Sequence, residues 1–328
     1  MSFRRDIDPA IIMVTDLYKS FPLSQGLFGK PKCLHAVNGV RFRVFEGETL
    51  GLVGESGCGK STVANLVLRL LKPDSGQINF KEHNLAALGK DRTQAAQLAK
   101  IQAVFQDPQS SLDPRMTVER IVGSPLLPYS GLNKSDRQDR VVAILQEVGL
   151  GPEHLKRYPH EFSGGQRQRI GIARALIVKP EFIVFDEPTS ALDVSVQAQI
   201  LNLIAELQIK HSYAYLFISH DLAVVRHISR RIAVMYLGRI VETALRDDLF
   251  QAPRHPYTRA LMDSVPEPDP AKRKTLAVLQ GDVPSPVNLP PGCPFHPRCG
   301  SAMKICALER PERSQITEDH FVECWLYN

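Results

Sequence analysis

Short apolar runs that end at glycine or at polar residues are the clearest pattern along the chain. TLGLV at 49–53 ends at a glycine, FIVF at 182–185 ends at two acids, and AYLFIS at 214–219 ends at a histidine. Such runs are typical of buried strands. Further strands are predicted at 11–18, 40–45 and 231–243.

Helices are predicted between these strands. The first begins at Ser61 and ends near Leu71, because Lys72 and Pro73 stop the pattern. The order of strand, glycine loop and helix indicates an α/β domain with a mainly parallel sheet. The other helical segments are predicted at 84–160, where prolines break the pattern, at 194–210 and at 221–229.

Composition and charge narrow the class of protein. The chain has 328 residues, of which 43% are apolar and 23% charged, values that exclude a mostly disordered or collagen-like chain. The net charge of +5 is small and no basic block occurs, so we expect a mixed-charge surface and no nucleic-acid partner. No stretch of about 18 consecutive apolar residues occurs, and the N-terminal residues do not resemble a secretory signal. We therefore expect a cytoplasmic protein whose membrane contact is made through a partner.

The segment GESGCGKST at 54–62 fits the phosphate-loop pattern G-x-x-x-x-G-K-[ST]. Glycines let successive backbone N–H groups face a phosphate, and the following helix adds its positive N-terminal end. Lys60 supplies charge for the β- and γ-phosphates, and Ser61 supplies a hydroxyl ligand for Mg²⁺. An accidental glycine turn is the alternative, but the segment lies between a predicted strand and a predicted helix. The predicted nucleotide-binding residues of this loop are Gly54, Glu55, Ser56, Gly57, Cys58, Gly59, Lys60, Ser61 and Thr62.

Polar residues at the ends of other predicted strands supply the remaining chemistry. Asp186 is predicted to hold Mg²⁺, and Glu187 to deprotonate the attacking water. Gln106 follows the strand-like run IQAVF and completes the Mg²⁺ shell and the water network. His220 is predicted to contact the γ-phosphate, with a structural histidine as the alternative. Cys58, inside the phosphate loop, is interpreted only as a small side chain.

The segment FSGGQRQRIGIARAL at 162–176 resembles the signature of ATP-binding cassette (ABC) ATPases. Ser163 is a good N-cap and Gln166 stands at the capping-box position. The glycines Gly164 and Gly165 each cost a helix about 1 kcal/mol, so they suggest close approach of a ligand to bare backbone. The resemblance implies that this helix end faces a γ-phosphate bound by the opposite subunit, and an ordinary helix start is the alternative.

Other positions match the same family in order. Phe21 resembles the aromatic residue that stacks on adenine, with a core phenylalanine as the alternative. Gln106 matches the family's glutamine loop and His220 its switch histidine, while Asp193 in SALD would communicate across the dimer. The resemblance implies an α/β fold of the P-loop NTPase class: an ABC-type nucleotide-binding domain with a RecA-like core, an antiparallel β subdomain and a helical subdomain. We expect this domain over 1–262, with its helical subdomain at about 107–180, and a small cysteine-rich C-terminal extension over 263–328.

The resemblance extends to one subfamily. The segments VFQDPQSSLDPR, YPHEFSGGQRQRI, PRHPYTRAL and LPPGCPFHPRC look like those of oligopeptide and dipeptide importers, and most like the F-type ATPase subunit. This implies an ATP- and Mg²⁺-dependent ATPase at the cytoplasmic face of the bacterial inner membrane. Its implied partners are a paralogous ABC ATPase in a heterodimer, two transmembrane permease subunits and an extracytoplasmic substrate-binding protein. Nickel or glutathione is the alternative cargo, and a soluble ABC ATPase of translation or DNA repair is a remoter alternative.

Cys293, Cys299, Cys306 and Cys324 crowd the end of the chain. Four thiolates suit zinc or an iron–sulfur cluster, and the spacing alone does not choose between them. Four thiols without a metal are the alternative, and His296 or His320 could replace a cysteine on zinc. The subfamily resemblance implies a four-iron–four-sulfur (4Fe–4S) cluster on the four cysteines. A regulatory redox module is a third hypothesis for the whole protein, but the intact ATP site indicates that this segment is accessory.

Overall fold

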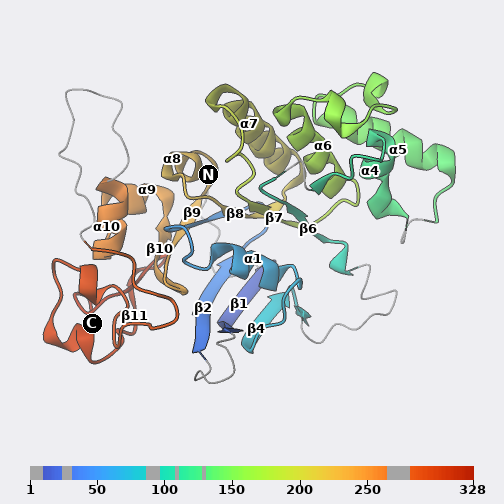
Figure 1. Ribbon diagram of the computed structural model, residues 1–328. Coiled ribbons are helices and arrows are strands. Elements are labelled where there is room, and N and C mark those ends of the chain that lie inside the picture. Colours follow the sequence, from blue (N-terminus) through green and yellow to red (C-terminus); the bar gives the residue numbers. More distant parts are fainter. Residues whose placement is uncertain (1–9, 24–31, 86–96, 108–110, 128–130, 264–280) are drawn as a thin grey trace, which may run out of the picture. The chain divides into compact units, whose positions relative to one another are not determined.

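The computed structural model describes residues 10–23, 32–85, 97–107, 111–127, 131–263 and 281–328 (Figure 1). The chain divides into two compact units. The first unit comprises Met1–Ile12, Val44–Glu48 and Ala87–Phe217, and the second comprises Met13–Arg43, Thr49–Ala86 and Ile218–Asn328. Among the described helices, none is long and apolar enough to span a membrane.

The second unit contains a four-stranded sheet built from the N-terminal strands. Its order is β2-β1-β4-β5, and β4 pairs with β5 in antiparallel register, Asn79 opposite Asn84. The valines and leucines of these strands supply buried side chains, including Val14, Leu17 and Val40. The strands are β1 (Ile12–Leu23), β2 (Lys32–Val44), β4 (Ser75–Phe80) and β5 (His83–Asn84).

A second group of strands in this unit carries the phosphate loop. The order is β11-β12-β10-β9-β3, with β3 parallel to β9 and the other pairs antiparallel. Every residue of β3 is buried, as its apolar run predicts, and α8 packs against it. The strands are β3 (Thr49–Val53), β9 (Arg231–Tyr236), β10 (Arg239–Leu245), β11 (Arg313–Thr317) and β12 (His320–Glu323). The helices are α1 (Lys60–Val67), α8 (Leu222–Ile228), α9 (Arg246–Gln251) and α10 (Pro256–Asp263).

The first unit combines three strands with a group of helices. Its strand order is β8-β7-β6, and β6 runs parallel to β7. Helices α4, α5 and α6 lie side by side in Figure 1 and contact one another. Phe185 and Tyr215 pack edge to face, with ring centroids 5.0 Å apart. The elements are β6 (Ile101–Val104), β7 (Phe182–Asp186), β8 (Ala214–Ile218), α4 (Val118–Gly123), α5 (Lys134–Glu147), α6 (Gly164–Leu176) and α7 (Val194–His211).

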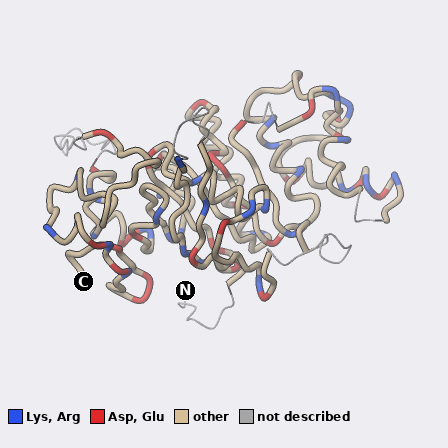
Figure 2. The backbone as a smooth tube through the Cα atoms, turned by 60° about the horizontal axis from the view of Figure 1, so that its bottom comes forward, with Lys and Arg blue, Asp and Glu red and all other residues tan. Residues whose placement is uncertain are grey.

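Most predicted elements are confirmed, and two predictions need correction. The helix predicted to reach Leu71 ends at Val67, because Arg69 has a left-handed φ of 58° and the N–H of Leu70 bonds to the carbonyl of Asn65. The helical segment predicted over 84–160 is interrupted by strand β6, and parts of it lie outside the described residues. The predicted boundary near residue 262 stays a prediction. Figure 2 shows basic and acidic residues interspersed along the described chain, in line with the small net charge.

Candidate functional site

The phosphate loop connects β3 to α1 in the second unit. Gly59 is the N-cap of α1 with a left-handed φ of 110°, and a Cβ there would lie 2.2 Å from the carbonyl oxygen of Ala36. Gly54 has a φ of 155°, and a Cβ there would lie 2.1 Å from the carbonyl oxygen of Met235. Only glycine fits at these two positions, so the two glycines of the motif are required by the backbone conformation of the loop.

Lys60 lies folded over this loop. Its side chain is buried, and Nζ donates to the carbonyl oxygens of Gly54 at 2.8 Å and Glu55 at 3.0 Å. The ammonium is therefore held at the loop by two neutral acceptors, where an anionic phosphate oxygen would be a stronger partner. With the hydroxyl of Ser61, exposed at the first turn of α1, this donor set fits a triphosphate with Mg²⁺.

The other predicted residues of this unit lie at element ends. Cys58 is buried, and burial raises the pKa of its thiol, as suits a small, unreactive side chain. Phe21 is half-buried near the end of β1, with Lys19 Nζ 5.6 Å from its ring centroid, so it is not a core phenylalanine. His220 is exposed between β8 and α8, next to the N-cap Asp221. The adenine contact of Phe21 and the phosphate contact of His220 stay predictions.

The first unit brings Gln106 and Glu187 together. Gln106 Nε2 donates to Glu187 Oε2 at 3.1 Å. Glu187 follows Asp186, the last residue of β7, and has a left-handed φ of 49°. A non-glycine residue in this conformation costs about 1–3 kcal/mol, and such strain persists where the surroundings over-determine it, often at functional sites. The amide therefore orients the carboxylate that the sequence predicts as the general base.

The signature segment begins α6 with a complete capping box. Ser163 Oγ accepts from the N–H of Gln166 at 3.3 Å, and Gln166 Oε1 accepts from the N–H of Ser163 at 3.0 Å. Gly165 has a structural reason that the sequence did not reveal: a Cβ there would lie 2.4 Å from Cγ1 of Val196. A Cβ at Gly164 would lie 3.2 Å from Leu192. Close packing against the segment around α7 is therefore one reason why both positions are glycine.

Asp193 begins α7. Its carboxylate accepts from the N–H of Val196 at 3.0 Å and from Ser195 Oγ at 2.9 Å. These hydrogen bonds, led by that of Val196, lower the pKa of Asp193. The observed role of Asp193 is helix capping, and communication across a dimer stays a prediction.

The iron–sulfur cluster predicted on the four C-terminal cysteines is wrong, and so is its zinc alternative. Among the described residues, which include all four cysteines, no group of three or more His, Cys, Asp or Glu side chains is arranged to hold a metal ion. The cysteines line a cavity of about 10 Å³, room for about one water molecule. Burial raises the pKa of Cys293 to about 11, so its thiol is protonated at neutral pH. The cavity is lined by these cysteines together with Phe295, His296 and Trp325.

An aromatic cluster attaches this segment to the rest of the second unit. Phe295 is buried, and its ring contacts Tyr236 of β9 edge to face at 5.3 Å. It also contacts Tyr257 of α10 at 5.5 Å, and Tyr236 and Tyr257 contact each other at 4.6 Å. Strand β12 adds backbone pairing to β10. These aromatic partners lie in other parts of the chain, so the local sequence of the segment does not reveal its core.

Two residues that the sequence argument missed contact the phosphate loop. Arg298 forms an ion pair with the Glu55 carboxylate, and Tyr257 accepts a hydrogen bond from the Glu55 N–H. Both lie in segments, PRHPYTRAL and LPPGCPFHPRC, that carried the subfamily resemblance. Their place in these two segments indicated that both residues belong to the subfamily pattern, but it did not show that their side chains contact Glu55.

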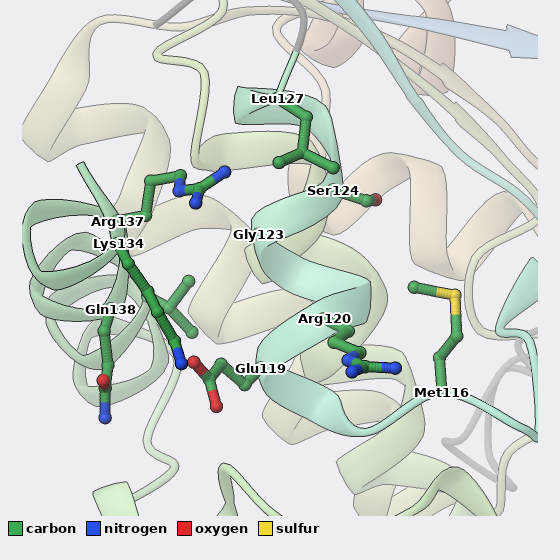
Figure 3. Close-up of a pocket in the computed structure, with 10 residues that line it drawn as sticks. Met116, Glu119, Arg120, Gly123, Ser124, Leu127, Lys134, Arg137 and Gln138 are labelled. Atoms are coloured by element: carbon green, nitrogen blue, oxygen red, sulfur yellow. The ribbon is translucent and has the colours of Figure 1, made fainter. Parts of the chain in front are cut away.

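A cavity of about 340 Å³ lies between α4 and α5 in the first unit (Figure 3). Figure 3 shows Glu119 of α4 and Lys134 of α5 pointing toward one another, with Arg120 and Met116 on the other side of α4. Leu127 at its edge is 64% exposed.

Comparison with known families matches two segments of the chain. Residues 37–190 match the family described as ABC transporter, and residues 241–306 match the family described as oligopeptide/dipeptide transporter, C-terminal region. The first match contains the phosphate loop, the signature segment and the two acids. The second contains Tyr257 and Arg298.

Full-length relatives are also similar. The oligopeptide transport ATP-binding protein AppF of Bacillus subtilis is 49% identical over 97% of this chain and 98% of its own. The oligopeptide transport ATP-binding protein OppF of Escherichia coli is 49% identical over 92% of each chain. The dipeptide transport ATP-binding protein DppF of Haemophilus influenzae is 45% identical over 94% of each.

Solved structures share the fold. A dimeric ATP-binding cassette in a post-hydrolysis state, bound to ADP and Pi, is 28% identical and covers 72% of this chain and 98% of its own, with a TM-score of 0.63. The cbiO1 protein of Clostridium perfringens, part of an ABC transporter complex, is 28% identical and covers 75% of this chain and 92% of its own, with a TM-score of 0.62. The predicted nucleotide-binding fold, a mixed sheet with helices, is thereby confirmed.

Proposed function

Because the chain belongs to the ATP-binding proteins of ABC transporters, and within them to the oligopeptide/dipeptide branch, we propose that it is the ATP-hydrolysing subunit of an importer of di- or oligopeptides. The observation that carries this proposal is the 49% identity to an oligopeptide transport ATP-binding protein over nearly the full length of both chains. The glycine conformations and the buried Lys60 of the phosphate loop support the ATP-binding part.

The loop residues bind the triphosphate. Gly54 and Gly59 hold the backbone so that N–H groups face the phosphates, and Lys60, whose ammonium is held by two carbonyl oxygens, donates its third N–H to a phosphate oxygen. Ser61, Gln106 and Asp186 would hold Mg²⁺. Held there, Mg²⁺ would supply positive charge against the negative charge of the phosphate oxygens.

Glu187 acts as the general base. Its carboxylate, oriented by Gln106, removes a proton from the water that attacks the γ-phosphate. His220 contacts the γ-phosphate, and Phe21 stacks on the adenine. These roles follow from the family pattern and from the positions of the residues at strand ends.

The protein works with a second cassette and with membrane partners. Ser163, Gly164, Gly165 and Gln166 face the nucleotide of that second cassette, and Asp193 communicates across the pair. The second cassette is a paralogue, and the cargo passes through two separate permease subunits from an extracytoplasmic substrate-binding protein. We place the protein at the cytoplasmic face of the inner membrane, held there by the permeases.

Transport in reconstituted vesicles tests this function. The complete complex, with its cognate permeases and second ATPase in proteoliposomes, should take up a di- or oligopeptide when MgATP and the loaded binding protein are supplied. The Lys60→Ala complex is the matched control and should not transport. Uptake of nickel or glutathione, with no peptide uptake, would contradict the peptide assignment. Transport that survives Lys60→Ala would contradict the assignment of this chain as the ATPase.

A further inference from the structure

A residue from the C-terminal part of the chain, Arg298, forms an ion pair with Glu55 of the phosphate loop. Arg298, the last residue of the turn η6 (His296–Arg298), places Nη1 2.9 Å from Glu55 Oε2 and Nη2 3.1 Å from Glu55 Oε1. Two parallel hydrogen bonds of this kind make a bidentate ion pair, which is the stronger and more directional form. The Arg298 side chain is 5% exposed and the Glu55 side chain 25%, so the ion pair is largely shielded from water.

The backbone of Glu55 is held as well. Its N–H donates to the hydroxyl oxygen of Tyr257 at 3.0 Å. Tyr257 is fully buried in the aromatic cluster with Tyr236 and Phe295, so its hydroxyl is fixed in place. Arg298 also lies 3.4 Å from the hydroxyl of Tyr236. The Tyr257 hydroxyl of the aromatic cluster and the Arg298 guanidinium thus both hold Glu55.

Glu55 is the residue through which such a support acts on the whole loop. Its carbonyl oxygen accepts from Lys60 Nζ at 3.0 Å and from the N–H of Cys58 at 3.3 Å. The preceding Gly54 has no side chain through which a neighbouring element could hold the loop, whereas Glu55 has one. Fixing Glu55 at both its carboxylate and its N–H therefore fixes the carbonyl that orients the ammonium.

We propose that Arg298 and Tyr257 are positioning residues of the phosphate loop, through which the C-terminal segment preorganises the loop for the triphosphate. This inference rests on the proposed ATP-binding function and deepens it. It gives the C-terminal segment a direct part in nucleotide affinity, independent of any metal. Preorganisation raises affinity because the ordering of the loop is already complete before the ligand binds.

The test compares two arginines that attach the C-terminal segment. Arg298→Gln removes the support of Glu55. Arg239→Gln is the matched control, because Arg239 forms a similarly buried ion pair with Glu323 of β12 but does not touch the loop. Equilibrium titration of the full-length protein with MgATP should give an affinity about 10-fold weaker for Arg298→Gln and nearly unchanged for Arg239→Gln. Tyr257→Phe, which deletes only the hydroxyl, should weaken binding by a smaller factor.

A double-mutant cycle separates positioning from general loosening. In a Glu55→Gln background, Arg298→Gln should add little further loss, because the two side chains act through one contact. Arg298→Lys keeps the charge but cannot form the two parallel hydrogen bonds. Its affinity for MgATP should therefore lie between those of the wild type and Arg298→Gln. In the complete complex the KM for ATP should rise while kcat stays within about twofold, as expected for lost ground-state binding.

The outcomes separate this inference from the function on which it rests. Equal losses for Arg298→Gln and Arg239→Gln, or additive effects in the cycle, would overturn the inference. If Lys60→Ala abolishes MgATP binding while Arg298→Gln leaves it unchanged, the inference fails and the proposed function stands. If the protein binds no MgATP at all, the proposed function fails first. Should Arg298→Gln not fold, Arg298→Lys and Tyr257→Phe decide the question by the same titration.

Discussion

The phosphate loop and the C-terminal cysteine segment both carry conspicuous sequence motifs, yet only one motif predicts its local structure. In the loop, consecutive residues carry the motif, and its glycines have the positive φ angles that glycine adopts readily, 155° at Gly54 and 110° at Gly59. In the cysteine segment, four thiols line one small cavity without forming a metal site in the described chain. A motif of consecutive residues is therefore a safer guide to local structure than one whose residues must also reach a precise arrangement in space.

The largest effect is expected on the rate of ATP hydrolysis, from a substitution of the predicted general base. Glu187→Gln should slow ATP hydrolysis by about 10²–10⁴-fold while MgATP binding is retained, because the amide cannot accept the proton of the attacking water. Glu181→Gln, just before the opposite end of β7, is the control and should leave turnover near normal. Steady-state phosphate release by the complete complex measures both. Near-normal turnover by Glu187→Gln would remove this residue from its role.

Beside the C-terminal cysteines, the pH dependence of stability tests the buried residues His255 and Glu242. His255 is fully buried, and burial lowers its pKa from 6.5 to about 4, while the facing Glu242 opposes and Arg259 adds to this shift. Below pH 6.5, His255 therefore binds a proton in the unfolded chain, whereas in the folded chain it does so only near pH 4. Stability should fall by about 3 kcal/mol as the pH falls across this window.

Urea unfolding at a series of pH values measures this loss. In His255→Asn, which keeps a side-chain acceptor for the Tyr257 N–H, the slope between pH 6.5 and 4 should flatten. Burial raises the pKa of Glu242, but its hydrogen bonds, first that of His320, together outweigh burial and lower the pKa from 4.5. Its own stabilisation is lost only as the pH falls below 4.5, so this second loss should persist in the variant. An unchanged slope in His255→Asn would contradict the assignment.

Thiol reactivity separates a metal-free segment from a metal-bound one. The pKa of Cys293 is raised from 9.0 to about 11, so it carries about a hundred times less thiolate than an ordinary cysteine. At mildly alkaline pH, iodoacetamide should modify the exposed Cys33 first and Cys293 at least about a hundred times more slowly. Peptide mapping by mass spectrometry gives both rates, and a chelator should change neither. Rapid labelling released only by a chelator would restore a metal site.

A smaller effect on stability is expected within the phosphate loop itself. Gly59→Ala adds a clash with the Ala36 carbonyl to an unfavourable φ, whereas Gly57→Ala meets nothing within 4 Å at a φ of 78°. Gly59→Ala should therefore be the less stable variant by about 1–3 kcal/mol. Thermal unfolding without nucleotide compares the pair. Equal stabilities would mean that the loop relaxes around the added methyl group.

Parts of the site were predictable because they depend on residues close in sequence. The capping box of Ser163 and Gln166 and the strand that ends at Asp186 follow from short-range patterns, and both are confirmed. Other parts depend on tertiary contacts that no spacing encodes. Gly165 is needed against Val196, and Arg298 meets Glu55 across 243 positions of sequence. The cluster prediction failed although the four cysteines line one cavity, because residue type and resemblance do not give the arrangement of ligands that a metal ion requires.

The central claim is that this chain binds ATP through its phosphate loop and cleaves it with the carboxylate at the end of β7. Single-turnover hydrolysis of radiolabelled MgATP by the complete complex tests this claim most directly, with wild type, Lys60→Ala and Glu187→Gln side by side. The account predicts rapid cleavage by the wild type, no bound nucleotide in Lys60→Ala, and bound but uncleaved ATP in Glu187→Gln. Cleavage at the wild-type rate by both variants would contradict it.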